Sequence, residues 1–199
     1  MYTIYGDVNS GNCYKVKLLA NQLALPYTWV GMDTLKKETQ SNAFLNRNPN
    51  GKIPLLETAD GKFLPESNAI LHFLAEGTAL LPGDRFEHAS VLQWLFFEQY
   101  SHEPYIATAR YIVRYLGRPP ELEAHLQTKM APGYKALRVM ESHLGSQPFF
   151  VGGRYTIADI GLFAYTNVAE EGGFDLVDFP AIRQWLDRVR GQPGFIEIG

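Results

Sequence analysis

The spacing of apolar residues changes near residue 82, and this change limits the possible folds of the chain more than any other feature. Up to about Gly77, short β-prone runs alternate with helical stretches. Beyond the linker at residues 81–84, which carries a proline and a glycine, strand signals largely vanish and helical spacing continues to the end. The sequence therefore predicts two domains, residues 1–78 with mixed strands and helices and residues 86–199 with helices only.

The first domain is predicted to have the order βαβαββα, with the last two strands paired as a hairpin. The predicted strands are residues 2–5, 27–30, 55–58 and 62–64. The expected N-caps of its three helices are Asn12, then Ser41 or Asn42, then Ser67 or Asn68.

The second domain is predicted to consist of successive helices. These helices run from about residue 91 to a break at 117–120, over 121–144, over 160–165, and from Pro180 onward. The second is expected to be interrupted at Pro132-Gly133, because proline lacks an amide hydrogen and clashes with the preceding turn. Thr156 and Asp159 have the spacing of a capping box, so Asp159 is interpreted as a helix cap rather than a catalytic acid.

Charge and cysteine content exclude several classes of function. The chain has 18 Lys and Arg against 21 Asp and Glu, a net charge of −3, so neither nucleic acid nor a membrane is an expected partner. The N-terminus has no signal-peptide pattern, and no apolar run is long enough to span a bilayer. Cys13 is the only cysteine and excludes a multi-cysteine metal site. We therefore expect a cytoplasmic protein without a metal.

The segment Ser10-Gly11-Asn12-Cys13 lies at a predicted strand-to-helix turn, where free N–H groups and the positive helix end favour an anion such as a thiolate. It looks like a C-x-x-C site with serine in place of the first cysteine. Ser10 is therefore a candidate to donate a hydrogen bond to a thiol that a substrate brings, with Asn12 as a second donor. Taken alone, both are more commonly turn and capping residues. Cys13 is predicted to be buried and unreactive.

Two further strings are typical of a site for a peptide-like ligand. Ile53-Pro54 stands at the start of a predicted strand, where a cis peptide bond would turn the Ile53 backbone outward and an ordinary trans turn is the alternative. Glu66 and Ser67 precede a predicted helix, so Ser67 can hold a carboxylate and Glu66 an ammonium group, as an α-amino-acid end requires. Ser67 alone is more commonly only a cap.

The order and spacing of these motifs closely resemble the glutathione transferase family. The resemblance covers nearly the whole chain: a thioredoxin-like first domain, the strings NPNGKIPLL at 48–56 and ESNAI at 66–70, and an all-helical second domain with TIADI at 156–160. It implies a homodimer with glutathione bound along one edge of the first domain. Ser10 matches the hydroxyl with which theta- and delta-like members stabilise the thiolate.

The resemblance also implies roles for individual residues. The Ile53 backbone, beside Pro54, would bind the cysteinyl unit, Glu66 and Ser67 the γ-glutamyl end, and Lys52 a carboxylate. Thr39 falls where many relatives carry a His or Gln that reaches the glycine carboxylate, a contact that Gln40 can take over. The pattern around Asn12 also looks like the nu-type bacterial members, in which a Thr/Asn pair stabilises the thiolate and disulfide-bond reduction is prominent.

The second domain is expected to supply the site for a small hydrophobic electrophile. Residues 96–105 mix aromatic and polar side chains on several faces, which suits a ligand groove, although dimer contacts and packing explain the aromatic residues equally well. For His102, a hydrogen bond to a neighbour is favoured over a role as general base. The candidate residues are Tyr100, His102, Tyr105 and Arg110.

The predicted function is that of a detoxifying glutathione transferase, in which the activated thiol of glutathione attacks an apolar electrophile or reduces a peroxide. Two alternatives stay open. One is a glutathione-dependent disulfide-bond reductase of the nu type. The other is a non-catalytic protein that binds glutathione or another partner.

Overall fold

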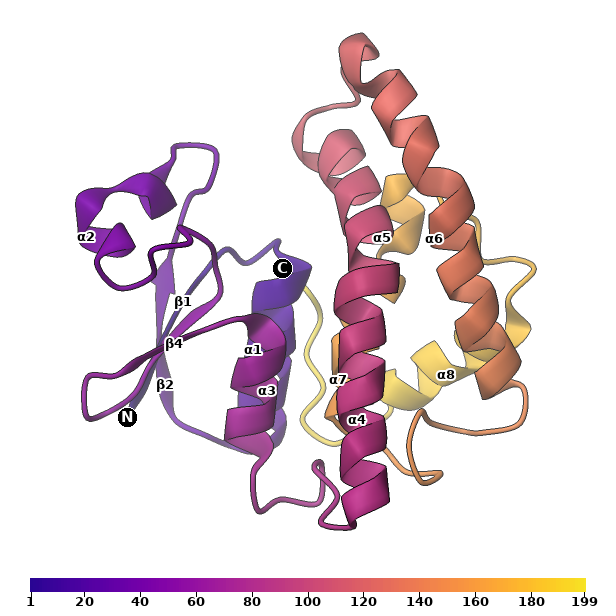
Figure 1. Cartoon of the computed structure of the whole chain (residues 1–199), viewed down its shortest axis with the longest axis horizontal. Helices are drawn as coiled ribbons and strands as arrows, with labels where there is room; N and C mark the ends of the chain where they lie inside the picture. Colours follow the sequence, from indigo (N-terminus) through magenta and orange to yellow (C-terminus); the bar gives the residue numbers. More distant parts are fainter. The chain divides into compact units, whose positions relative to one another are not determined.

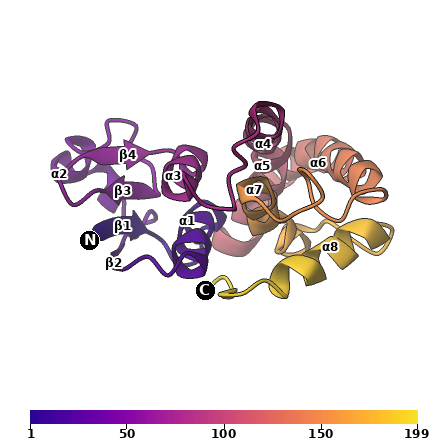
Figure 2. The ribbon, with the colours of Figure 1, turned by 90° about the horizontal axis from the view of Figure 1, so that it is seen from below.

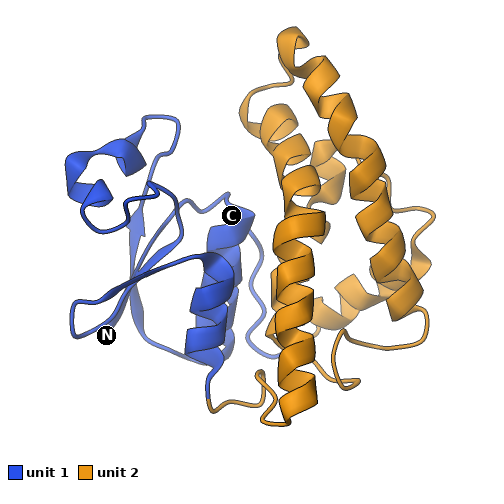
Figure 3. Ribbon diagram, viewed as in Figure 1, with its two compact units in different colours: residues 1–76, 193–199 blue, residues 77–192 orange.

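The computed structural model describes residues 1–199, which form two compact units (Figure 3). Unit 1 comprises residues 1–76 and 193–199, and unit 2 comprises residues 77–192. The predicted fold class is confirmed, because unit 1 combines a sheet with helices and unit 2 is helical. None of the helices is long and apolar enough to cross a membrane.

Unit 1 is built on a four-stranded mixed sheet with the strand order β2-β1-β3-β4. β1 pairs in parallel with β2 and antiparallel with β3, and β3 pairs antiparallel with β4. Helices α1 and α3 pack against each other on one face of the sheet, and α2 lies on the other side (Figures 1 and 2). The elements are β1 (Tyr2–Gly6), α1 (Gly11–Gln22), β2 (Tyr27–Gly31), the 3₁₀ turn η1 (Glu38–Gln40), α2 (Asn42–Leu45), β3 (Leu55–Glu57), β4 (Phe63–Pro65) and α3 (Ser67–Ala75).

The strand register brings four separate chain segments to one end of this sheet. Leu55, the first residue of β3, pairs with Tyr5 near the end of β1 and with Pro65 at the end of β4. β2 runs parallel to β1, so its last residue also lies at this end. The turn into α1, the loop after β2, the Ile53-Pro54 pair and Glu66 therefore all leave the sheet at the same end. This topology gathers candidates that are far apart in the sequence.

The short helix α2 is fixed to the sheet by a small apolar cluster. Phe44 is buried against Tyr5 and Leu55, and Val30, Met32 and Ile53 pack around them. Burial of a side chain such as that of Phe44 contributes about 1.5–3 kcal/mol to the free energy of unfolding. Ser41 caps α2 by accepting a hydrogen bond from the Phe44 N–H at 3.4 Å, which confirms one of the two predicted caps.

The C-terminal residues 193–199 belong to unit 1, whereas the predicted boundary assigned them to the helical domain. Two side chains of α1 hold this tail. The Tyr14 hydroxyl donates to the Ile196 carbonyl at 2.6 Å, and the Asn21 amide donates to the Gly194 carbonyl at 2.7 Å. The tail follows the last helix without a periodic pattern of its own, so the sequence offers no signal for these contacts.

Unit 2 is arranged around α7 (Ile157–Thr166), which is buried along its whole length and contacts α4, α5 and α8. α4, η2, α5 and η3 follow one another without a break and form one long helical segment in Figure 1, with π-helical turns at η2 and η3. The remaining elements are α4 (Arg85–Phe97), η2 (Glu98–His102), α5 (Glu103–Arg110), η3 (Tyr111–Tyr115), η4 (Pro120–Leu122), α6 (Glu123–Leu144), η5 (Ala169–Gly172) and α8 (Pro180–Arg190).

The predicted interruption of α6 at Pro132-Gly133 is wrong, because the helix continues through both residues. A proline inside a helix costs about 3 kcal/mol relative to alanine, and packing of α6 against α5 and α8 offsets this cost. Gly133 contributes to packing: a Cβ atom there would lie 2.5 Å from the Phe174 ring, so only glycine lets the ring approach the helix this closely.

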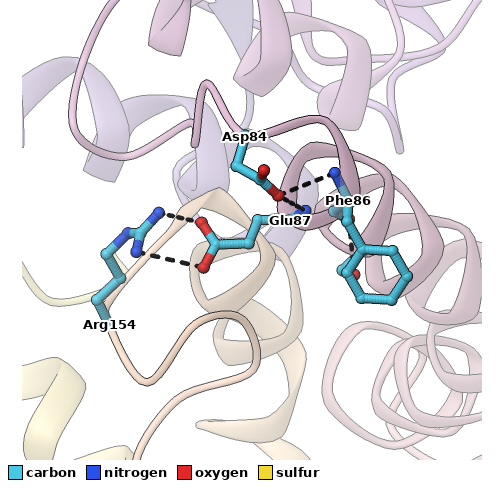
Figure 4. A network of polar contacts seen from close by, with 5 residues as sticks. Asp84, Phe86, Glu87 and Arg154 are labelled. Carbon is cyan, nitrogen blue, oxygen red and sulfur yellow. Dashed lines mark hydrogen bonds and ion pairs between the residues drawn. The ribbon is translucent and has the colours of Figure 1, made fainter.

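The start of α4 is held by a polar network (Figure 4). The Asp84 carboxylate caps the helix by accepting hydrogen bonds from the N–H groups of Phe86 at 3.0 Å and Glu87 at 2.9 Å. The Glu87 carboxylate in turn forms a bidentate ion pair with the guanidinium group of Arg154. This network ties the first turn of α4 to the turn that follows α6, and the partly exposed ion pair contributes about 0–1 kcal/mol.

Candidate functional site

Ser10 is half-buried and occupies the N-cap of α1. Its Oγ accepts a hydrogen bond from the Cys13 N–H at 3.4 Å, which is long for this type of bond. The Ser10 side chain also hydrogen-bonds the Cys13 thiol. A hydroxyl proton can rotate, and a thiolate ligand is a stronger acceptor than this neutral thiol, so the Ser10 hydroxyl can donate to such a ligand instead. The first turn of α1 has no acidic residue, so no carboxylate there offsets the positive end of the helix. Both features favour an anion beside Ser10.

Asn12 is not the N-cap of α1, contrary to the prediction, because Ser10 takes that position and Asn12 lies inside the first turn. Its Oδ1 accepts hydrogen bonds from Lys15 Nζ at 2.8 Å and from Ser67 Oγ at 3.2 Å. Lys15 Nζ also lies 3.4 Å from Ser67 Oγ. These three side chains, the Asn12–Lys15–Ser67 cluster, join the first turn of α1 to the first residue of α3.

Cys13 is buried in α1, as predicted. Burial raises the pKa of its thiol to about 12, because desolvation outweighs the hydrogen bond with the Ser10 side chain, which lowers it. A thiol with this pKa is almost entirely protonated at neutral pH, and the thiolate is the reactive form of cysteine. Cys13 is therefore a packing residue, as the sequence predicts.

The loop that ends at Ile53 is braced by its own polar side chains. Gln40 Nε2 donates to the Gly51 carbonyl at 3.0 Å, and Asn48 Nδ2 donates to the Lys52 carbonyl at 2.8 Å. Thr39 is buried, and its hydroxyl oxygen accepts a weaker contact from Gln40 at 3.4 Å. Thr39 thus supports the loop from inside, whereas Gln40 and Lys52 are exposed to solvent. The Ile53–Pro54 peptide bond is cis, one of the two isomers that the sequence leaves open.

The predicted N-cap of α3, Ser67 or Asn68, is wrong. Glu66 is the N-cap residue of α3, with no side-chain capping bond, and Ser67 is the first residue inside the helix. The backbone of Glu66 has φ 72° and ψ 112°, a region that costs a non-glycine residue about 1–3 kcal/mol and that is found mainly at functional positions. The Glu66 side chain is exposed, and Ser67 is buried.

Two of the four candidates in unit 2 are engaged within that unit. His102 Nε2 lies 2.9 Å from the Thr166 hydroxyl oxygen, whose own proton is donated to the Leu162 carbonyl, so Nε2 is the donor and not a base. The predicted hydrogen bond of His102 to a neighbour is thereby confirmed. Arg110 is buried, and its Nε donates to the Glu171 carboxylate at 2.8 Å.

The two tyrosines among these candidates differ in exposure. The Tyr100 side chain is 83% exposed on η2, and Tyr105 on α5 is half-buried. Their assignment to an electrophile site stays a prediction.

Asp159 is a helix cap, as predicted. Its two oxygens accept hydrogen bonds from the Thr156 N–H at 2.9 Å, the Trp185 Nε1–H at 2.9 Å and the Phe150 N–H at 3.2 Å. Burial nevertheless raises the pKa of this carboxyl to about 6, because desolvation outweighs these hydrogen bonds. The group joins α7 to α8 and to residue 150, and it has no opening to solvent.

Lys15 is the functional candidate that reasoning from the sequence missed. It is fully buried, which is rare for lysine and is not suggested by composition or periodicity. The available signal was its spacing of three residues from Asn12, which places both side chains on one face of a helix. The partner on α3 lies 52 residues further on, so only the packing of α1 on α3 completes the cluster.

Family models match both units. Residues 1–76 match the model described as the glutathione S-transferase N-terminal domain, and residues 99–193 match the corresponding C-terminal domain. A solved structure described as a glutathione S-transferase from Pseudomonas fluorescens is 54% identical, covers 99% of this chain and 98% of its own, and superposes with a TM-score of 0.98.

Two further relatives differ in what their names describe. The disulfide-bond oxidoreductase YfcG of Escherichia coli is 30% identical over 92% of this chain and 87% of its own length. The glutathione transferase URE2P6 of Phanerochaete chrysosporium, solved in complex with oxidized glutathione, is 27% identical over 97% of this chain and 92% of its own, with a TM-score of 0.87.

Proposed function

The chain belongs to the glutathione S-transferase family, and we propose that it activates the thiol of bound glutathione for attack on an electrophile. In this proposal, Ser10 and Asn12 hydrogen-bond the sulfur in unit 1. The solved relative at 54% identity, which is described as a glutathione S-transferase, supports the activity. The thiol comes from the ligand because the chain's own Cys13 is held protonated.

The observation that carries the proposal is the cap geometry of Ser10. Its hydroxyl accepts a long hydrogen bond from the Cys13 N–H and contacts the neutral Cys13 thiol, a weaker acceptor than a thiolate, at a helix whose first turn has no acidic residue. A thiolate placed there accepts the Ser10 proton in a charge-assisted hydrogen bond. Lowering a thiol pKa near 8.5 by two units requires about 2.7 kcal/mol, which one such bond and a helix end together supply.

The proposed reaction balances as a nucleophilic substitution. The glutathione thiol loses its proton to solvent and becomes a thiolate. The thiolate sulfur forms a bond to an electrophilic carbon, and the bond from that carbon to its leaving group breaks, so that the leaving group departs with the electron pair. The protein contributes by stabilising the thiolate and by holding glutathione in place, and it forms no covalent bond itself.

We propose that the rest of glutathione binds at the end of the sheet where the candidate segments meet. The Ile53 backbone would pair with the cysteinyl unit, and Glu66 and the Ser67 N–H would hold the γ-glutamyl ammonium and carboxylate groups. Lys52 and Gln40 are exposed near the loop and are assigned to the glycine carboxylate. Thr39 is assigned an indirect role, because it is buried beneath Gln40.

An ultraviolet-difference titration of glutathione bound to the purified protein tests the proposal. The absorbance of the thiolate is followed against pH, with free glutathione as the reference. We expect the pKa of the bound thiol to lie about two units below that of the free thiol. Binding with an unshifted pKa would contradict thiol activation, and no binding at millimolar glutathione would favour a non-catalytic interaction protein.

A disulfide-bond reductase is the second candidate, favoured by the 30% identical oxidoreductase and by the relative that binds oxidized glutathione. In that reaction the glutathione thiolate attacks one sulfur of a disulfide and releases the other as a thiolate. A second glutathione then resolves the mixed disulfide and leaves as oxidized glutathione. Turnover of a small mixed disulfide that exceeds turnover of a halogenated aromatic compound would establish this function.

We further propose that the protein is a cytoplasmic homodimer that takes a small hydrophobic electrophile and serves detoxification. Light scattering coupled to size-exclusion chromatography tests the dimer, which should have twice the monomer mass of 22.4 kDa. Tyr100→Ala and Tyr105→Ala test the electrophile site. We expect either substitution to raise KM for an aromatic electrophile while leaving KM for glutathione unchanged.

A further inference from the structure

Lys15 occupies an unusual position in unit 1. Its side chain is fully buried in α1, although a buried ammonium group is expensive unless it is well paired. Its Nζ lies 2.8 Å from Asn12 Oδ1 and 3.4 Å from Ser67 Oγ. Both contacted residues belong to the proposed glutathione site, one at the thiol end and one at the γ-glutamyl end.

The chemistry of the ammonium group decides how the Asn12 amide is oriented. An ammonium group only donates hydrogen bonds, so the Asn12 atom that faces it has to be the oxygen. The Ser67 hydroxyl, which also contacts this oxygen at 3.2 Å, can donate or accept and would satisfy either orientation. Lys15 is therefore the member of the cluster that distinguishes the oxygen of Asn12 from its nitrogen.

The orientation matters because an amide has an acceptor at one end and a donor at the other. With Oδ1 facing Lys15, the NH₂ end of the amide is the end directed away from Lys15, and Asn12 itself lies in the first turn of the helix that Ser10 caps. A thiolate is stabilised by an N–H donor and is repelled by a carbonyl oxygen. A flipped Asn12 would therefore work against the thiolate that Ser10 stabilises.

We propose that Lys15 is a positioning residue that fixes the Asn12 amide with its NH₂ group toward the sulfur of glutathione. This inference rests on the proposed function. It adds that a fully buried side chain sets the pKa of the bound thiol without contacting the ligand.

The test compares the pKa of bound glutathione in Lys15→Met and in a matched control, Lys17→Met. Methionine has a similar length without charge or donors, and the Asn12 oxygen keeps the Ser67 hydroxyl as a donor. Lys17 lies on the same helix with its Nζ over the Trp29 ring, away from the cluster. We expect Lys15→Met to raise the bound thiol pKa by about one unit, a tenfold change in thiolate formation, with glutathione affinity little changed. Lys17→Met should leave the pKa as in the wild type.

A double-mutant cycle with Asn12→Ala separates positioning from a merely structural role. If Lys15 acts through Asn12, adding Lys15→Met to Asn12→Ala should raise the thiol pKa much less than it does in the wild type. An equal increase in both backgrounds would overturn the proposal, and so would an unchanged pKa in the Lys15→Met single variant. If Lys15→Met does not fold by circular dichroism, Lys15→Gln replaces it, since glutamine can face Asn12 with either end and should also raise the pKa.

The pKa of the bound thiol distinguishes failure of the proposed function from failure of the role of Lys15. An unshifted thiol pKa in the wild-type protein would contradict the proposed function itself. A lowered pKa in the wild type that Lys15→Met does not change would leave the proposed function intact and refute the role of Lys15 alone.

Discussion

The entrances of helices α1 and α7 show how two similar helix ends acquire different uses. At α7, Asp159 accepts hydrogen bonds from Thr156, Phe150 and Trp185, and no part of the carboxylate is exposed. At α1, the cap bond of Ser10 is long, the first turn has no acidic residue, and Ser10 is half-buried. At α7, the Thr156 N–H is satisfied by the protein's own carboxylate, so this helix end stabilises the fold. A helix end without one keeps its donors for an anion from outside.

Ser10→Ala should have the largest effect on activity of the substitutions at the two helix ends. We expect kcat/KM with glutathione to fall tenfold to a thousandfold, equivalent to about 1.4–4 kcal/mol of transition-state stabilisation. Glutathione affinity should change little, because the hydroxyl acts on the sulfur and not on the peptide backbone. Steady-state kinetics at saturating electrophile measure the effect.

Ser41→Ala is the matched control for this prediction. Ser41 caps α2 with the same 3.4 Å geometry but has no place in the proposed site. Loss of a serine cap costs about 0.5–2 kcal/mol of stability, and both variants should show a similar loss in urea unfolding. Only Ser10→Ala should lose activity. If Ser10→Ala had wild-type kinetics, thiol activation would have to be assigned to Asn12 instead.

Asp159→Asn should have the largest effect on stability and little on chemistry. Asparagine keeps the shape but replaces one accepting oxygen with an NH₂ group, which then faces a donor such as the Thr156 N–H. Leaving buried donors unpaired costs about 1–3 kcal/mol each, so we expect a loss of about 2–4 kcal/mol. Urea unfolding of unit 2 measures the loss. If Asp159→Asn changed the pKa of the bound thiol, the α7 cap would not have a purely structural role.

The pH dependence of stability should carry the signature of Asp159. Its pKa is raised by burial from 3.8 to about 6 in the folded state, so between these values the folded protein binds a proton that the unfolded chain releases. The contribution of Asp159 therefore falls as pH rises from about 4 to 6, by about 2–3 kcal/mol in total. Comparison of unfolding free energies of the wild type and Asp159→Asn across this range isolates it. A gap between them that widens with pH would contradict the raised pKa.

Cys13→Ala should have the smallest effect on activity. Because burial raises the Cys13 pKa to about 12, we expect glutathione-dependent turnover to stay within about twofold of the wild type. Stability should fall by about 1 kcal/mol for the lost packing. Iodoacetamide should leave the folded wild-type protein unlabelled at pH 8 and label it in urea. Rapid labelling of the folded protein would show that Cys13 is reactive and could itself act as the nucleophile.

Local chemistry in the sequence was enough to identify several features of the two helix ends. The spacing of Thr156 and Asp159 predicts the α7 cap, and the absence of a sulfur at position 10 predicts that the nucleophile comes from a ligand. Caps and turns depend on residues within three or four positions of each other, so the sequence displays them directly. The change of periodicity near residue 82 predicts the division into a mixed part and a helical part for the same reason.

The errors occurred where a distant contact outweighs a local preference. Pro132 would end an isolated helix, but α6 continues through it while packed against α5 and α8, and Gly133 lets Phe174 pack against it. Residues 193–199 follow the last helix in sequence but bond to Tyr14 and Asn21 on α1. Neither the continuity of α6 nor the position of residues 193–199 can be predicted from neighbouring residues in the sequence.

The sequence by itself determined the order of the elements, the two-part architecture and the identity of most candidate residues, because these follow from spacing and residue type. Only the tertiary structure decided which of those residues are buried and which side chains contact one another. The register of β1, β3 and β4 brings the candidate segments to one end of the sheet. The packing of α1 on α3 buries Lys15 between Asn12 and Ser67. Orientation and burial depend on partners some fifty residues apart in the chain, and those partners meet only when the sheet and its helices have assembled.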